Sequence, residues 1–406
     1  SKILETDQWL HPSFNLALSE SIVIRNRRIF LFAPLLAVLV AASPPSLLSF
    51  AGGVSSDHRL ASKAGAEILS LGGNAVDAAI ATALAAGVVQ PAGSGLGGGG
   101  FALVQEKENP ALVLDFRERA PKAASRNMYV ESKREKASRV GGLAVAIPNE
   151  SNGLLELHAK YGTKSLKELV APAMRYAKGY PVGGYLHRAL GKLAEREEDF
   201  LQRYYSLSER PNMGAIVRNT RLRKTLRDWA KTGGQALKSG WIAQDLVDTV
   251  QADGGILSMD DLDSIQAVYR EPLQGKYRGW TIYTMPPPSS GGVVLLQLLS
   301  VLEEYDISAM GRNSAELFHL YAEVFQHAFS DRANHLGDPD RITVPVDELL
   351  DQKRIEAIRA SFDPKQTLKS ADYGTKLDIG RDEGTQHISV IDKNGLSVSL
   401  TSTLNT

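Results

Sequence analysis

The stretch Asp382-Glu383-Gly384-Thr385-Gln386-His387-Ile388-Ser389 places a threonine directly after a glycine, at the head of a predicted strand. If the bond between Gly384 and Thr385 is cut, Thr385 carries both a hydroxyl and a free α-amine. The amine then serves as the base for the hydroxyl, which is one of the few ways to make an alcohol nucleophilic near pH 7. Gly384 and Thr385 are therefore a candidate processing site, and Thr385 is a candidate catalytic nucleophile.

The residues after Thr385 predict a β-hairpin that returns to it. Apolar residues alternate with polar ones on both sides of Asn394-Gly395, and Asn-Gly is a strong signal for a hairpin turn. Folding at this turn brings Thr385 level with residues 402–404, so that Thr401, Thr403 and Asn405 lie beside it. These small polar side chains either form part of a reactive site or occupy the solvent-exposed face of an edge strand.

His387 follows Thr385 by two residues and therefore shares its face of the strand. A histidine at this position is a candidate general base. A freed α-amine needs no second base, however, so we assign His387 a structural or supporting role.

A pair of helices and a glycine-rich segment are predicted near the start of the folded part. The helix 60–70 ends at Gly72-Gly73, and the following helix, 75–86, is apolar nearly all round and should be buried. Gly93–Gly98 matches G-x-G-x-x-G, but a helix precedes it and a strand follows, which is the reverse of a dinucleotide site. We interpret these glycines as a place where two backbones pass closely, with an oxyanion or substrate carbonyl nearby as a further option.

Further elements are predicted from periodicity and turn residues. We expect strands at 101–105 and 111–116, helices at 165–178, 186–196, 220–232, 293–304 and 314–334, a helix start at 260, a hairpin at 276–285, and a polar surface loop at 340–381. Helices and strands together predict an α+β fold. No break in composition is sharp enough to divide this region into two domains.

Arg117 lies at the end of the strand 111–116, within Asp115-Phe116-Arg117-Glu118. An arginine here is well placed to bind a carboxylate by two parallel hydrogen bonds. The alternative is an ion pair with Asp115 or Glu118 at the exit of the strand. The sequence alone does not separate these two interpretations.

Composition excludes several classes of function. The 406 residues include 46 basic and 46 acidic residues and no cysteine, which disfavours a nucleic-acid partner and excludes disulfides and thiol chemistry. The eight histidines form no metal-binding motif, so we expect neither a metal nor another cofactor. A basic cluster at 25–28, an uncharged run at 29–42 and small residues at 41–45 predict a secretory signal peptide, with a core helix or an uncleaved membrane anchor as alternatives.

Seven stretches stand out, in this order: Ala61-Ser62-Lys63-Ala64-Gly65, Gly72-Gly73-Asn74-Ala75-Val76-Asp77-Ala78-Ala79, Gly95-Leu96-Gly97-Gly98-Gly99-Gly100-Phe101, Asp115-Phe116-Arg117-Glu118, Met285-Pro286-Pro287-Pro288-Ser289-Ser290-Gly291-Gly292, Leu336-Gly337-Asp338-Pro339 and Gly384-Thr385-Gln386-His387-Ile388-Ser389-Val390. Together they resemble the γ-glutamyltransferase (γ-glutamyltranspeptidase, glutathione hydrolase) family. The resemblance runs from about residue 52 to the end of the chain.

This resemblance implies an N-terminal-nucleophile hydrolase fold, a four-layer αββα sandwich. It implies a precursor cut at Gly384–Thr385, with residues 1–50 as signal peptide or anchor, 51–384 as large subunit and 385–406 as the start of the small subunit. Thr385 would attack glutathione or related γ-glutamyl donors and pass glutamate to water, amino acids or peptides. By position, Thr403 would help activate Thr385, Arg117 would bind the donor's α-carboxylate, and Asn405 would help bind its α-amino end.

Two alternatives accompany this expectation. One is a related amide hydrolase, such as a β-lactam side-chain acylase or a poly-γ-glutamate-processing enzyme. The other is an inactive, truncated paralogue, because the family carries a full small subunit and only 385–406 of it is present here. For the same reason we expect this chain to be inactive by itself. The signal peptide implies a secreted or periplasmic protein.

Overall fold

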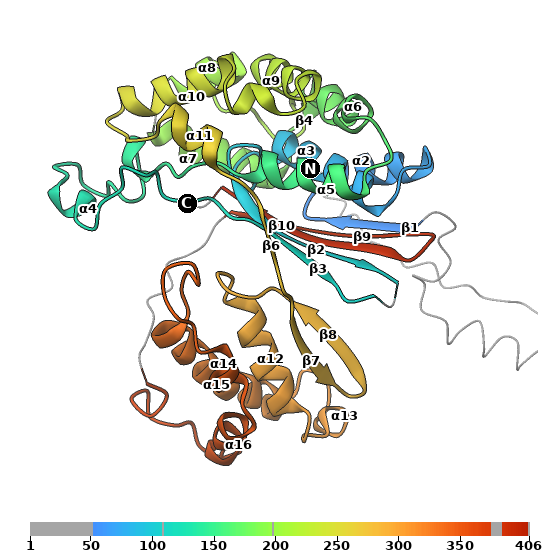
Figure 1. Cartoon of the computed structure of the whole chain (residues 1–406), viewed down its shortest axis with the longest axis vertical. Coiled ribbons are helices and arrows are strands. Elements are labelled where there is room, and N and C mark those ends of the chain that lie inside the picture. Colours follow the sequence, from blue (N-terminus) through green and yellow to red (C-terminus); the bar gives the residue numbers. More distant parts are fainter. Residues whose placement is uncertain (1–51, 108, 197–198, 375–383, 405–406) are drawn as a thin grey trace, which may run out of the picture. The chain divides into compact units, whose positions relative to one another are not determined.

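The computed structural model describes residues 52–107, 109–196, 199–374 and 384–404. Internal contacts separate the segment Ser1–Leu48 from the unit Ser49–Thr406, and all that follows concerns this second unit. Its fold is mixed α+β (Figure 1). The run at 25–45 and Asn405 lie outside the described residues, so the predictions made for them stay predictions.

A six-stranded antiparallel sheet organises the unit, in the order β1-β9-β10-β2-β3-β6. The strands are β1 (Gly52–Ser56), β9 (Thr385–Asp392), β10 (Leu396–Thr403), β2 (Gly99–Glu106), β3 (Leu112–Phe116) and β6 (Val268–Arg270). The hairpin of β9 and β10 is thus inserted between β1 and β2, which are the first two strands of the described chain. Figure 1 shows the red hairpin between them.

The hairpin forms as its sequence predicts. Along β9, exposed and buried residues alternate strictly, and the turn at Asn394-Gly395 has Gly395 at φ 86°, a conformation that favours glycine. The carboxylate of Asp392 accepts hydrogen bonds from the backbone N–H of Asn394 at 2.8 Å and of Ala75 at 3.1 Å. Asp392 therefore holds the turn and also ties the hairpin to the helix layer.

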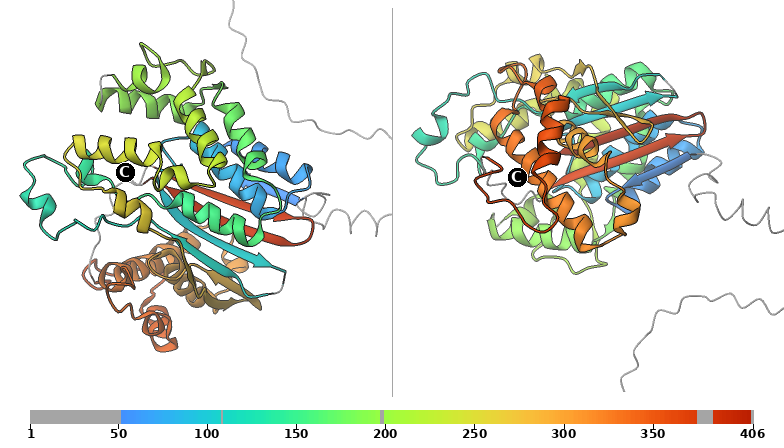
Figure 2. Two further views of the ribbon diagram at one scale, coloured as in Figure 1. Left: turned by 45° about the horizontal axis from the view of Figure 1, so that its top comes forward. Right: turned by 90° about the horizontal axis from the view of Figure 1, so that it is seen from below.

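Helices cover one face of the sheet (Figures 1 and 2). They include α2 (Arg59–Ser70), α3 (Ala75–Val89), α5 (Glu150–Tyr161) and α6 (Leu166–Tyr176). α3 is buried along nearly its whole length, which confirms the prediction from its small apolar residues. Asn74 and Asp77 cap its start reciprocally, as a capping box. Ile388, Val390, Val398 and Leu400 of the hairpin point into the same core.

More helices continue this layer. They are α7 (Gly184–Arg196), α8 (Phe200–Tyr205), α9 (Thr220–Lys231), α10 (Trp241–Ala252) and α11 (Met259–Ser264), with a small sheet of β4 (Tyr180–Pro181) and β5 (Ile216–Val217). The short helix α4 (Met128–Glu131) has no buried residue and lies apart from this layer in Figure 1. Trp229 of α9 is fully buried, and its indole N–H donates to Ser151 of α5 at 2.7 Å. The predicted helices at 165–178, 186–196 and 220–232 are confirmed.

A second group of elements lies in the sequence between β6 and β9. It contains the hairpin β7 (Leu273–Tyr277) and β8 (Trp280–Thr284) and the helices α12 (Gly291–Leu302), α13 (Ile307–Met310), α14 (Ala315–His335), α15 (Val346–Leu350) and α16 (Gln352–Ser361). The prediction of a surface loop over 340–381 was therefore wrong for 346–361. The large apolar residues of α16 are Ile355 and Ile358, which are buried against α12 and α14, so only this narrow apolar face indicates the helix.

Within the described ranges, no helix is both long enough and apolar enough to cross a membrane. α12 is apolar but has only 12 residues. α14 has 21 residues but carries charged side chains along its length.

Candidate active site

Thr385 opens β9 directly opposite Thr403 near the end of β10. The Thr385 hydroxyl donates to Thr403 Oγ1 at 3.4 Å, and the Thr403 hydroxyl donates to the carbonyl oxygen of Gly384 at 2.8 Å. Thr385 is exposed, whereas Thr403 is only 6% exposed. The predicted register, with Thr385 level with 402–404, is confirmed.

This arrangement joins the candidate nucleophile to the bond that precedes it. A hydroxyl that donates to a carbonyl oxygen stabilises the negative charge that develops there during attack. Thr403 donates its hydroxyl hydrogen to Gly384, and its oxygen accepts the hydrogen of the Thr385 hydroxyl. The three groups form a relay from the Thr385 hydroxyl to the carbonyl of the peptide bond between Gly384 and Thr385.

The row of small polar side chains divides into two parts. β10 is an interior strand between β9 and β2, so the expectation of an edge strand was wrong. Ser399 is exposed to solvent, as the second interpretation expects. Thr403 instead contacts the Thr385 hydroxyl. The ring of His387 is held by Thr401, with Nδ1 and Oγ1 at 2.8 Å, and by Ser399 at 3.3 Å. These contacts fit the supporting role that the sequence suggested for His387.

The glycine segment lies beside this pair. A Cβ on Gly98 would lie 2.1 Å from the carbonyl oxygen of Thr403, and one on Gly99 would lie 2.5 Å from the backbone nitrogen of Glu118. Both positions therefore exclude any side chain. This confirms that the glycines allow close backbone passage, and it places β2 directly against the end of β10.

Arg117 follows β3 at the same end of the sheet as Thr385. Its guanidinium pairs with Glu118 at 3.3 Å, and its side chain is 38% exposed. Asp115 accepts a hydrogen bond from the Arg117 backbone but forms its ion pair with Arg270, at 2.7 Å. The alternative of an ion pair with Glu118 is thus observed in this structure, while the exposure leaves the guanidinium accessible to a ligand.

Glu150 is a further residue at this site, and the sequence did not single it out. It is the first residue of α5, fully buried, and it accepts hydrogen bonds from the hydroxyl of Ser402 and from the backbone N–H of Gly95. Burial raises its pKa to about 8, against the opposing effect of these two hydrogen bonds. An acidic residue in the first turn of a helix is common, so the sequence carries no signal of this burial.

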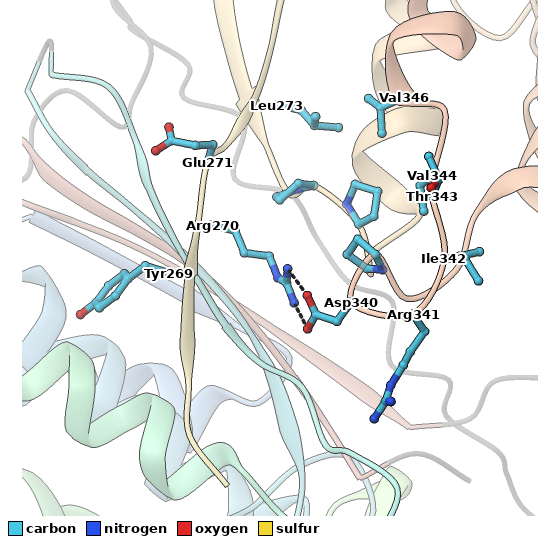
Figure 3. A pocket seen from close by; sticks show the side chains of 13 residues that line it. Tyr269, Arg270, Glu271, Leu273, Asp340, Arg341, Ile342, Thr343, Val344 and Val346 are labelled. Carbon is cyan, nitrogen blue, oxygen red and sulfur yellow. Dashed lines mark hydrogen bonds and ion pairs between the residues drawn. The ribbon is translucent and has the colours of Figure 1, made fainter.

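A pocket with a volume of about 790 Å³ lies away from Thr385, between β6, the residues after it, Pro286-Pro287 and the segment 339–346 (Figure 3). In Figure 3 the side chain of Arg270 points at Asp340, and the two groups pair at 3.0 Å. Since Arg270 also binds Asp115, it links β3 to this segment. The residues that line the pocket do not include Thr385, Thr403 or Arg117, so we place the candidate chemistry at the end of the hairpin instead.

In the described part of the chain, no group of three or more histidine, aspartate and glutamate side chains is arranged to hold a metal ion. Among the described residues, the groups that can act directly at the site are the hydroxyls of Thr385 and Thr403 and the guanidinium of Arg117. The Thr385 hydroxyl can attack an amide, and the Arg117 cation can bind a carboxylate of the substrate.

Known proteins resemble this chain over most of its length. The profile of the family described as Gamma-glutamyltranspeptidase matches residues 61–406. The "Glutathione hydrolase proenzyme" of Pseudomonas sp. (strain A14) is 36% identical over 382 residues, covering 90% of this chain and 65% of that protein. The "Acylase ACY 1 proenzyme" of Pseudomonas sp. (strain V22) is 35% identical over 367 residues, covering 87% of this chain and 65% of that protein.

Among solved structures, the γ-glutamyltranspeptidase of Helicobacter pylori matches with a TM-score of 0.76 and 33% sequence identity. The match covers 82% of this chain and 99% of that chain. The chain spans less than two thirds of the length of the two curated relatives, at 65% of each.

Proposed function

Because the chain belongs to the γ-glutamyltranspeptidase family, we propose that the protein is a γ-glutamyltransferase or glutathione hydrolase with Thr385 as its N-terminal nucleophile. The observation that carries this proposal is the relay from the Thr385 hydroxyl through Thr403 to the carbonyl of Gly384, with distances of 3.4 and 2.8 Å. The same residues can act first in self-cleavage and then in turnover.

In the proposed self-cleavage, Oγ1 of Thr385 attacks the carbonyl carbon of Gly384. Thr403 stabilises the oxyanion, the C–N bond breaks, and the proton of the hydroxyl ends on the nitrogen of Thr385. The product is an ester between Gly384 and Thr385. Water then hydrolyses this ester, which leaves a carboxylate on Gly384 and a free hydroxyl and α-amine on Thr385.

In the proposed turnover, the α-amine takes the proton of the Thr385 hydroxyl as this attacks a γ-glutamyl amide. The amide nitrogen leaves with a proton, and glutamate stays bound to Thr385 as an ester. Water, an amino acid or a peptide then takes the glutamyl group. Thr403, which is buried beside Thr385, holds the hydroxyl in line for both steps.

Arg117 is the proposed anchor of the donor's α-carboxylate. Its ion pair with Glu118 is 3.3 Å long and partly exposed, so a substrate carboxylate can replace Glu118 at modest cost. Asn405 is the proposed partner of the donor's α-amino group. Glutathione and other γ-glutamyl compounds offer both groups, which is why we propose them as donors.

A second candidate is a related amide hydrolase, which the 35% identity to the acylase ACY 1 favours. A poly-γ-glutamate-processing enzyme is the other member of this class. Comparing γ-glutamyl-p-nitroanilide with glutaryl-p-nitroanilide, which lacks the α-amino group and therefore tests that end of the donor, separates glutamyl transfer from acylase activity. A γ-glutamyltransferase prefers the former by at least about 100-fold in kcat/KM; equal rates, or a preference for the glutaryl amide, contradict the proposal.

The proposal also covers the location of the protein and the layers of its fold. The order of basic, apolar and small residues at 25–45 supports a secreted or periplasmic location. The match to the H. pylori structure supports the four-layer αββα arrangement for the family fold.

A further inference from the structure

Glu150 lies directly behind the strand that carries Thr403. Side chains alternate along β10, so Ser402 faces the helix layer and Thr403 faces Thr385. The Ser402 hydroxyl donates to Oε2 of Glu150, and the backbone N–H of Gly95 donates to the same oxygen at 3.3 Å. The Glu150 carboxyl is therefore hydrogen-bonded to the end of β10 on the buried face of this strand.

The two-residue segment Asn149-Glu150 contacts three segments that surround the Thr385–Thr403 pair. The backbone N–H groups of Asn149 and Glu150 both donate to the carbonyl of Gly98, at 2.8 and 2.9 Å. The side-chain amide of Asn149 donates to the carbonyl of Arg117 at 3.3 Å. The start of α5 thus joins the glycine segment, the donor anchor and, through Ser402, the strand of Thr403.

We propose that Glu150 is a positioning residue for the Thr385–Thr403 pair, an inference that rests on the proposed function. By fixing Ser402, Glu150 fixes the direction of the next residue, Thr403. The hydrogen bond from Thr403 to Gly384 O at 2.8 Å depends on that direction. Glu150 touches neither Thr385 nor the reacting carbonyl, and it acts only through β10.

Glu150 performs this role as a neutral carboxyl. It is fully buried, and its Oε1 has no hydrogen-bond partner in the described chain, so an ionised form would be poorly solvated. Its raised pKa, about 8, has burial as the main cause. Ionisation above this pH would draw the carboxyl towards water and loosen its hold on Ser402.

Charged neighbours do not account for this behaviour. α3 carries Asp77, which the backbone of Thr163 binds at the far end of that helix, and β2 carries Glu106 at its exposed far end. Asp115 of β3 faces away from α5 and pairs with Arg270. β10 and residues 90–98 carry no titratable side chain, and the titratable residues of α5 itself are Glu156, His158, Lys160 and Tyr161.

Amide hydrogen exchange, read by mass spectrometry, tests the positioning without relying on activity. We expect Glu150→Ala to speed exchange at residues 400–403 about tenfold, which corresponds to one lost hydrogen bond, and to leave 396–399 unchanged. Glu150→Gln keeps an acceptor for Ser402 and should match the wild type at pH 7. The wild type, but not Glu150→Gln, should loosen at residues 400–403 above about pH 8.

Ser402→Ala keeps the test decisive if Glu150→Ala does not fold, because it removes the link and leaves the carboxyl in place. Glu156→Gln, an exposed change on the same helix, is the matched control and should alter nothing. Uniform acceleration along β10, or a change below threefold in both Ser402→Ala and Glu150→Ala, overturns the proposal.

Self-cleavage at Gly384–Thr385 supplies the functional readout. We expect Ser402→Ala and Glu150→Ala to slow it at least tenfold at pH 7, and Glu150→Gln to restore the rate and remove its decline above about pH 8. Equal rates for Glu150→Ala and Glu150→Gln contradict the positioning role. If the wild-type full-length gene product neither cleaves itself nor hydrolyses γ-glutamyl amides, the proposed function fails, and the exchange data still decide the role of Glu150.

Discussion

Glu150→Gln should change how the stability of the protein depends on pH. The pKa of Glu150 lies at about 8 in the folded protein, against an ordinary value of 4.5 that we assign to the unfolded chain. The folded state therefore holds a proton that the unfolded state releases. The stabilisation from this proton is complete below pH 4.5, falls as the pH rises, and levels off above about pH 8.

The size of the effect follows from the two pKa values. Each pH unit between them costs about 1.4 kcal/mol, so the wild type should lose about 4 kcal/mol relative to Glu150→Gln between pH 5 and pH 8. Glutamine is neutral throughout, and the difference between the two proteins isolates this one group from all others that titrate.

Urea unfolding at several values between pH 5 and pH 9 measures this difference. Both proteins should carry Thr385→Ala, so that cleavage does not change the molecule during the experiment. Glu156→Gln, also in this background, should give a curve parallel to that of its parent, because Glu156 is exposed on the same helix. A difference between Glu150→Gln and its parent that stays flat with pH would refute the claim that Glu150 is buried and neutral.

Three further predictions concern the site. Thr403→Val should slow self-cleavage by about 10²–10³, the usual cost of one lost oxyanion donor, and Thr403→Ser should restore most of the rate on a time-resolved gel. Gly98→Ala should destabilise the protein by at least about 2 kcal/mol in urea, since its Cβ would lie 2.1 Å from Thr403 O, whereas Gly183→Ala, with open space, should change stability by less than about 0.5 kcal/mol. Arg117→Lys should raise the KM for a γ-glutamyl amide about tenfold or more with a smaller effect on kcat, because a lysine loses two-point binding; an unchanged KM would remove Arg117 as the anchor.

Local patterns in the sequence predicted much of the fold around the site. The Asn394-Gly395 turn and strict alternation placed Thr385 level with residues 402–404, and the small apolar residues of α3 indicated its burial. These features depend on neighbours in sequence, so they can be read without a structure. The strand β1 and the helices α15 and α16 were missed because each is short and presents only a few apolar residues.

The role of Glu150 could not be read in the same way. Its environment is made by Gly95 and Ser402, which lie 55 and 252 residues away along the chain. The sequence around it, Asn149-Glu150-Ser151, is typical of an exposed helix start. Similarly, the sequence allowed either Asp115 or Glu118 as the ion-pair partner of Arg117. The structure shows that Asp115 pairs with Arg270 instead, which leaves Glu118 as the partner of Arg117.

The central claim is that Thr385 becomes an N-terminal nucleophile by cutting its own chain, and mass spectrometry of the full-length gene product tests it most directly. We predict a new N-terminus at Thr385 in the wild type and an uncut chain in Thr385→Ala. A wild-type chain that stays whole after prolonged incubation, or a Thr385→Ala variant that is still cut at this bond and active, would contradict the account.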